Sequence, residues 1–137
     1  MIGIIVVTHH NLGAALLDTA EFILGTRPES LTSVSINVNE NPDQLRDKIV
    51  NAIRSLKKSN GILILTDMFG GTPSNLSYSL LEAGCVEVLS GVNLAILLKA
   101  INSRGKMELV ALAECLENHG KRSVSLASGI LKGSKSN

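Results

Sequence analysis

The stretch from residue 62 to residue 75 constrains the fold of this chain most, because a strand, a tight loop and a helix start follow one another there. Its first four residues are apolar and predict a buried β-strand. Thr72 suits the N-cap of the next helix and Pro73 its first turn, where a missing N–H costs no hydrogen bond. Gly70 and Gly71 permit a close approach of the backbone, with several N–H groups gathered at the helix N-terminus. The stretch predicts a β-to-α connection that is either an ordinary turn or an anion site.

Apolar runs of strand length alternate with helical stripes along the chain. The run Ile2–Val7 is continuous, as expected for a central parallel strand covered on both faces. The predicted strands cover residues 2–7, 34–38, 61–66 and 86–89, and the predicted helices cover residues 12–24, 42–58, 73–81, 94–101 and 107–119. This alternation predicts an α/β fold with a doubly wound, mostly parallel open sheet flanked by helices. Val124 and Leu126 suggest a short C-terminal strand over Ser123–Ala127.

The composition is that of one globular domain. The chain has 137 residues, of which 45% are hydrophobic and 18% charged, and we expect a domain over residues 1–128 and a disordered tail over residues 129–137. Its net charge is +1 without a basic cluster, so nucleic-acid binding is not expected. No apolar segment reaches the ~18 residues of a membrane span, and no basic leader precedes the first apolar run. We therefore expect a cytoplasmic protein.

Two predicted strands end in side chains that can do chemistry. The first strand is followed by Thr8 and His9, and the third by Thr66 and Asp67. In open parallel sheets the functional site lies beyond the carboxyl ends of the strands, where the strand order reverses. This topology places His9 and Asp67 at the same edge of the sheet, and Asn93, which follows the fourth strand, reaches that edge too.

A histidine beside a carboxylate can act as a nucleophile. A neutral imidazole attacks through one ring nitrogen while the other holds the proton, and a carboxylate fixes that tautomer and stabilises the positive charge that develops. Asp67 is placed to do this for His9, and the amides of Gly70, Gly71 and Thr72 are placed to hold a phosphoryl group. The alternative is that His9 is a structural residue, as most single histidines at strand ends are.

Other kinds of site find no support in the sequence. A Gly-Lys-[Ser/Thr] phosphate loop is absent, so nucleotide hydrolysis is not expected. The two cysteines stand thirty residues apart and no cluster has metal-ligand spacing, so we expect neither a metal nor a cofactor. The Gly-x-Ser-x-Gly elbow that would make Ser74 or Thr72 a nucleophile is also missing.

Three motifs resemble those of one protein family. They are Val7-Thr8-His9, the long segment Thr66-Asp67-Met68-Phe69-Gly70-Gly71-Thr72-Pro73-Ser74-Asn75, and Gly91-Val92-Asn93. With them, residues 1–128 resemble the IIA component of the mannose family of the bacterial phosphoenolpyruvate-dependent sugar phosphotransferase system. The long segment is the specific one, whereas either short motif alone would be weak.

The resemblance implies a phosphohistidine carrier. In the family, the site histidine falls on His9, its orienting carboxylate on Asp67, and the phosphate-binding turn on Gly70, Gly71 and Thr72. The phosphoryl group comes from HPr, is carried on Nε2, and passes to a IIB component, so that the membrane is involved only through a IIC/IID transporter. The family is usually a homodimer that exchanges a C-terminal strand, here Ser123–Ala127. The residues expected to line the site are Thr8, His10, Thr66, Met68 and Asn93.

The residue after the predicted site histidine departs from the family's pattern. The family usually has a small residue, often glycine, directly after its histidine, whereas this chain has His10. His10 either modulates the site or is an incidental loop residue.

The acceptor of the phosphoryl group and the role of the chain leave alternatives open. The chain has no room for a fused IIB domain, so we expect a separate acceptor. The alternatives are a regulatory module whose phosphorylation state controls partner binding, and the phosphoryl-donor subunit of dihydroxyacetone kinase.

Overall fold

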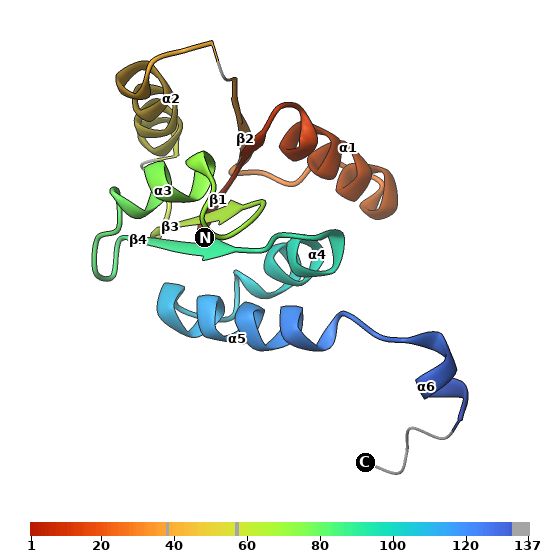
Figure 1. Cartoon of the computed structure of the whole chain (residues 1–137). Helices are drawn as coiled ribbons and strands as arrows, with labels where there is room; N and C mark the ends of the chain where they lie inside the picture. The colour runs from red at the N-terminus through yellow and green to blue at the C-terminus, as the bar shows by residue number, and fades with distance from the viewer. Residues whose placement is uncertain (38, 57, 133–137) are drawn as a thin grey trace.

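The chain folds around a parallel β-sheet. The structure, a computed structural model, describes residues 1–37, 39–56 and 58–132 (Figure 1). Strands β1 (Gly3–His9), β2 (Leu31–Ile36), β3 (Ile62–Thr66) and β4 (Val86–Ser90) form a sheet in the order β2-β1-β3-β4. Each neighbouring pair is parallel. The predicted α/β fold with a doubly wound parallel sheet is confirmed.

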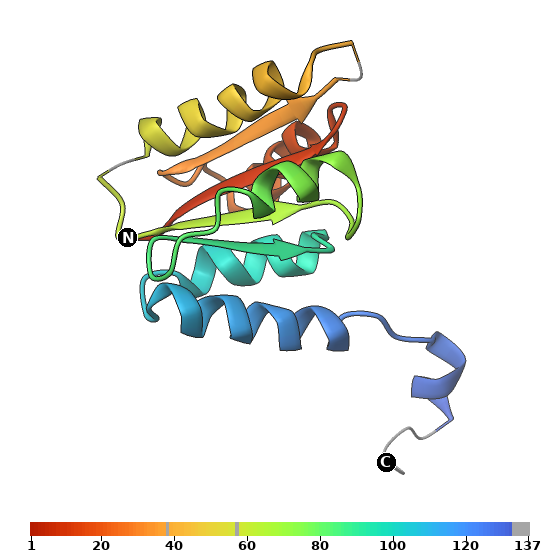
Figure 2. The same ribbon diagram turned by 60° about the vertical axis from the view of Figure 1, so that its left-hand side comes forward.

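Helices cover both faces of the sheet (Figure 2). Helices α1 (Leu12–Leu24), α4 (Leu94–Ser103) and α5 (Leu109–Arg122) pack on one face, and α2 (Pro42–Ser55) and α3 (Thr72–Tyr78) on the other. Successive side chains of a strand point to opposite faces, so Ile4 and Val6 join the first core while Ile5 and Val7 join the second. The continuous apolar run of β1 is explained by this burial on both sides.

The helix ends differ from the sequence prediction at two glycines. Helix α3 begins at Thr72 with Gly71 as its N-cap, so the expected cap at Thr72 is wrong by one residue. Helix α5 does not stop at Gly120 but runs on to Arg122. A Cβ at Gly120 would lie 2.7 Å from Cδ1 of Ile96, so this glycine lets α5 approach α4 closely rather than ending the helix.

The C-terminal segment leaves the body of the molecule. Residues 124–126 are extended without strand pairing and lead into the short helix α6 (Ala127–Leu131), which projects away from the sheet in both views (Figures 1 and 2). The strand expected over Ser123–Ala127 is thus not formed in this single chain, because an extended segment becomes a strand only when a neighbour shares its backbone hydrogen bonds. Side chains of Val124 and Leu126 are 82% and 76% exposed.

Some of the predicted elements extend into residues that the structure does not describe. Val38 and Lys57, at the ends of the second predicted strand and helix, lie outside the described residues, as do residues 133–137 of the predicted tail. Across the described ranges, no helix combines the length and apolarity that crossing a membrane requires.

Candidate functional site

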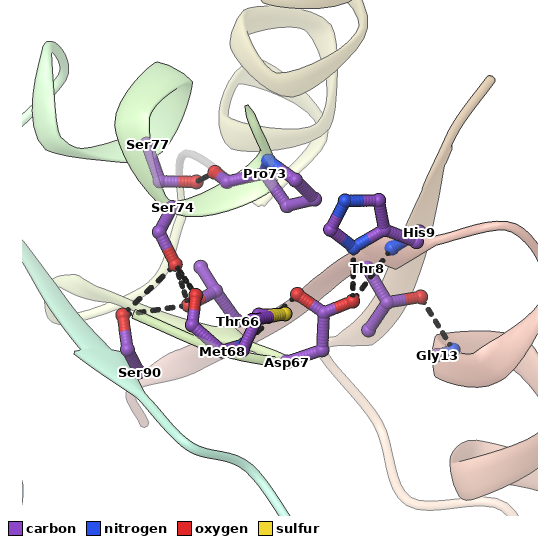
Figure 3. A network of polar contacts seen from close by, with 10 residues as sticks. All are labelled: Thr8, His9, Gly13, Thr66, Asp67, Met68, Pro73, Ser74, Ser77 and Ser90. Atoms are coloured by element: carbon purple, nitrogen blue, oxygen red, sulfur yellow. Dashed lines mark hydrogen bonds and ion pairs between the residues drawn. The ribbon is translucent and has the colours of Figure 1, made fainter. Parts of the chain in front are cut away.

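His9 and Asp67 meet where the strand order reverses. Strand β1 lies between β2 and β3, and its register pairs Val7 with Thr66, so both strands end at the same edge. Nδ1 of His9 lies 2.7 Å from Oδ2 of Asp67 (Figure 3). The predicted pairing of these two strand ends is therefore present in the structure.

The Asp67 carboxylate receives three hydrogen bonds. Oδ2 accepts from the His9 amide at 2.9 Å as well as from the ring, and Oδ1 accepts from the Met68 amide at 2.9 Å. Burial alone would raise the pKa of Asp67, but the bonds from His9 and Met68 and the attraction of His9 outweigh it and hold the pKa below its ordinary value. Asp67 is therefore an anion at neutral pH and can only accept, so the proton of a neutral His9 sits on Nδ1.

The other edge of the imidazole faces the glycine loop. A Cβ at Gly71 would lie 3.0 Å from Cε1 of His9 and 3.6 Å from Nε2, so any side chain there would require the imidazole to shift by a few tenths of an ångström. Gly70 has a φ of +88°, in the region that favours glycine. The His9 side chain is 46% exposed. An unprotonated Nε2 is thus open to a reaction partner beside the start of α3.

Thr8 holds the end of β1 against α1. Its side chain is fully buried, and its Oγ1 accepts a hydrogen bond of 2.8 Å from the Gly13 amide. Asn11, at the N-cap of α1, makes no side-chain cap, so Thr8 supplies the acceptor that this helix start needs. Thr8 therefore positions His9 through the backbone.

Four hydroxyl groups lie beneath the turn that carries Asp67, and we call them the hydroxyl cluster: Thr66, Ser74, Tyr78 and Ser90. Oγ1 of Thr66 lies 2.6 Å from Oγ of Ser74 and 2.8 Å from Oγ of Ser90. Ser90 lies 3.0 Å from Ser74 and 2.6 Å from the Tyr78 hydroxyl. Ser74 also donates to the Met68 carbonyl (Figure 3). Thr66 is one of the residues predicted to line the site, whereas the meeting of the four hydroxyl groups does not follow from the sequence pattern.

The remaining predicted residues take different places. His10 is exposed and has a φ of +50°, while its amide donates to the Ile36 carbonyl at 3.2 Å. Met68 is 55% exposed beside the glycine loop, and Thr72 is exposed at the first position of α3. The Asn93 side chain caps α4 by accepting from the Ile96 amide at 2.8 Å and donates to Ser123 at 3.1 Å. These two bonds hold α4 and the end of α5 in place, and a role of Asn93 in lining the site stays a prediction.

Comparisons with known proteins agree on one family. Residues 3–117 match the family described as "PTS system fructose IIA component". The chain is 32% identical over 119 residues to the fructose-specific EIIA component of Bacillus subtilis, covering 86% of this chain and 79% of that protein. It is 33% identical over 117 residues to the mannose-specific EIIAB component of Escherichia coli, covering 82% of this chain but 36% of that longer protein.

The fold agrees with a solved relative. The crystal structure of the phosphotransferase system component EIIA from Streptococcus agalactiae superposes with a TM-score of 0.81 at 30% identity, covering 93% of this chain and 98% of that one. The arrangement of the strands and helices around His9 and Asp67 is thus one that a phosphotransferase-system protein of similar sequence also has.

Proposed function

The chain belongs to the family of PTS system fructose IIA components, and from this membership we propose that it carries a phosphoryl group on Nε2 of His9. The donor is the phosphohistidine of HPr and the acceptor is a histidine of a separate IIB component. The observation that carries the proposal is the 2.7 Å contact between Nδ1 of His9 and Oδ2 of Asp67, which directs the ring proton to Nδ1 and leaves the Nε2 lone pair free.

The transfer step needs only the groups that are present and the two partners. The Nε2 lone pair of His9 attacks the phosphorus of the donor, and the phosphorus–nitrogen bond of the donor breaks with its electron pair returning to the donor ring. The proton stays on Nδ1, so the product imidazole carries a positive charge that Asp67 stabilises at 2.7 Å. In the second transfer a ring nitrogen of the IIB histidine attacks the phosphorus, and the bond to Nε2 breaks with its electron pair returning to the His9 ring.

Backbone dipoles are proposed to hold the phosphoryl group. Gly71, the N-cap of α3, lies beside the Nε2 edge of His9, and Gly70 and Thr72 flank it at this helix start, where N–H groups favour an anion. Residues 8–13 and 66–75 contain no lysine or arginine, so no fixed cation of these loops binds the group. Such a site suits a carrier, which must release what it binds.

The setting of this carrier is also proposed. We place it in the cytoplasm, with the membrane involved only through a IIC/IID transporter, and we propose that it is a homodimer. The exposed apolar side chains of Val124 and Leu126 support strand exchange, since pairing this segment with the outer edge of β4 in a second copy would cover both.

The test is HPr-dependent phosphorylation followed by intact-mass measurement. The wild-type chain with phosphoenolpyruvate, enzyme I and HPr should gain the mass of one phosphate as an acid-labile, alkali-stable adduct. His9→Ala should gain none, whereas His10→Ala, which removes the neighbouring imidazole, should gain it normally. Loss of the phosphate from His10→Ala and its retention in His9→Ala would contradict the assignment. Adding IIB should then remove the phosphate, and its retention would contradict the acceptor step alone.

A further inference from the structure

We propose that Ser74 is a positioning residue: through the Met68 carbonyl it holds the turn that directs the Asp67 carboxylate at His9. Ser74 is fully buried in α3, and its hydroxyl donates to the carbonyl of Met68 (Figure 3). The kinetic consequence of this inference rests on the proposed function of His9, whereas its structural consequence does not.

Met68 is held at both of its backbone groups. Its amide donates to Oδ1 of Asp67 at 2.9 Å, and its carbonyl accepts from Ser74. The peptide unit on either side of Met68 therefore has a set orientation, and the carboxylate that the amide holds has one too. Releasing the carbonyl would let the turn rotate and would weaken the bond from the Met68 amide.

The hydroxyl cluster strengthens this hold by the direction of its protons. A carbonyl oxygen can only accept, so the single proton of Ser74 must point at Met68. Thr66 donates its own proton to Ser90 at 2.8 Å, so Ser90 is left to donate to Ser74, 3.0 Å away, and Tyr78, 2.6 Å from Ser90, to donate to Ser90. Hydrogen bonds that run in one direction polarise and strengthen one another. The row from Tyr78 to Met68 thus ends on the turn that carries Asp67.

The cluster also joins the three elements that surround the turn. Thr66 ends β3, Ser90 ends β4 opposite it in the register, and Ser74 lies in the first turn of α3. Every second side chain of a strand points to the same face of the sheet, so Thr66 shares a face with Ile62 and Ile64, which pack in the core under α2 and α3. This places the Thr66 hydroxyl on the side of the sheet where α3 and Ser74 lie. The cluster therefore fixes the start of α3, and with it Gly71, against the imidazole.

Ser77 supplies a matched control within the same helix. Like Ser74 it is fully buried, but its hydroxyl donates to the Pro73 carbonyl at 2.7 Å, inside α3 itself. Ser77→Ala thus removes a buried hydroxyl from α3 without releasing Met68. Tyr78→Phe removes the outermost hydroxyl of the row while keeping Ser74, and serves as a second, milder variant should Ser74→Ala fold poorly.

The experiment uses the full chain with two independent readouts. NMR titration of the unphosphorylated protein measures the pKa of Asp67 and the ¹⁵N shifts of the His9 ring, while quenched-flow phosphorylation by HPr measures the rate. In Ser74→Ala we expect the pKa of Asp67 to rise toward its ordinary value and the rate to fall about tenfold, as the loss of one hydrogen bond to a charged group would cause. Tyr78→Phe should show smaller changes of the same sign, and Ser77→Ala should match the wild type.

The outcomes separate this inference from the proposed function. If the wild type accepts no phosphate, the proposed function fails, yet the NMR titration still tests whether Ser74 positions Asp67. If Ser74→Ala and Tyr78→Phe leave both the pKa of Asp67 and the His9 ring shifts at their wild-type values, the positioning role is overturned. Equal rate losses in Ser74→Ala and Ser77→Ala would also overturn it, because the effect would then come from α3 in general.

Discussion

Replacing Asp67 by asparagine exchanges one carboxylate oxygen, a hydrogen-bond acceptor, for an NH₂ group, a donor. This NH₂ group conflicts with the N–H donors that surround the side chain. Oδ2 accepts from both the amide and the ring of His9, and Oδ1 accepts from the Met68 amide. An amide must place its NH₂ at one of these two positions, where it faces a donor. If it faces His9, the ring proton moves to Nε2 and blocks the nucleophile; if it faces Met68, two N–H groups oppose each other. Either arrangement removes the negative charge.

The stabilisation of the transferring state that Asp67→Asn loses can be bounded from the contact between Asp67 and His9. Opposite unit charges about 4 Å apart attract by about 4 kcal/mol at an effective dielectric constant of ~20. Water screens the pair because the His9 side chain is 46% exposed, so this is an upper bound. The loss of one hydrogen bond to a charged group, about 1.5 kcal/mol, is the lower bound. We therefore expect Asp67→Asn to slow phosphorylation by about 10- to 10³-fold.

The assay is single-turnover transfer from phosphorylated HPr, with the ¹⁵N shifts of the His9 ring as the report of its tautomer. Asp18→Asn is the matched control, since Asp18 is a surface carboxylate that is 74% exposed and pairs with Arg27 at 3.3 Å. It should leave the rate unchanged. An Asp67→Asn protein that is phosphorylated as fast as Asp18→Asn, with the ring proton still on Nδ1, would refute the role given to the carboxylate.

The remaining predictions concern the loops, acid stability and assembly. His10→Gly should raise the free energy of unfolding in urea titrations by about 0.5–1 kcal/mol. A φ of +50° costs an L-residue about 1–2 kcal/mol, and the flexibility of glycine in the unfolded chain offsets part of what is gained by removing that cost. An unchanged free energy of unfolding would mean that the backbone is unstrained at this position. Gly71→Ala should slow phosphorylation about tenfold or more, since its Cβ would lie 3.0 Å from Cε1 of His9, and an unchanged rate would show that the ring moves aside freely. The folded pKa of Asp67 is lowered, so its contribution to stability is complete above the unfolded pKa of about 4 and is lost as the pH falls through the folded pKa. Urea titrations below about pH 4 should therefore show the wild type losing its advantage over the Asp67→Asn protein, and a constant difference would contradict this. Removing residues 124–137 should turn a dimer into a monomer in light scattering, and a full chain that is already monomeric would refute the exchanged strand.

Local sequence pattern was sufficient to predict the strands and the pairing of side chains at their ends. The continuous apolar run of Ile2–Val7 predicted a strand buried on both faces, and the positions of His9 and Asp67 at the carboxyl ends of β1 and β3 predicted that they are partners. The first prediction depends on hydrophobic periodicity, and the second adds the rule that sites lie at the carboxyl ends of parallel strands. Hydrophobic periodicity is a property of a few neighbouring residues, so it can be recognised in the sequence before the fold is known.

Gly120 and His10 are two positions where the local sequence pattern misleads. Gly120 looked like a helix stop, yet it lies within α5 because the helix must pass close to Ile96. His10 carries a positive φ although histidine does not favour it, because the chain turns there from β1 toward α1. The reason for each is a neighbour or a connection that belongs to the tertiary structure, and the sequence around the residue does not contain it.

The sequence by itself determined which residues stand at the ends of β1 and β3, because hydrophobic periodicity is written in neighbouring residues. Only the tertiary structure decided that the imidazole offers Nδ1 to Asp67 and Nε2 to Gly71, and that Thr66, Ser74, Tyr78 and Ser90 gather beneath the turn. It also decided that residues 124–126 have no strand to pair with in a single chain. Side-chain orientation and pairing depend on which distant segments pack together, and that is settled by burial of the whole core.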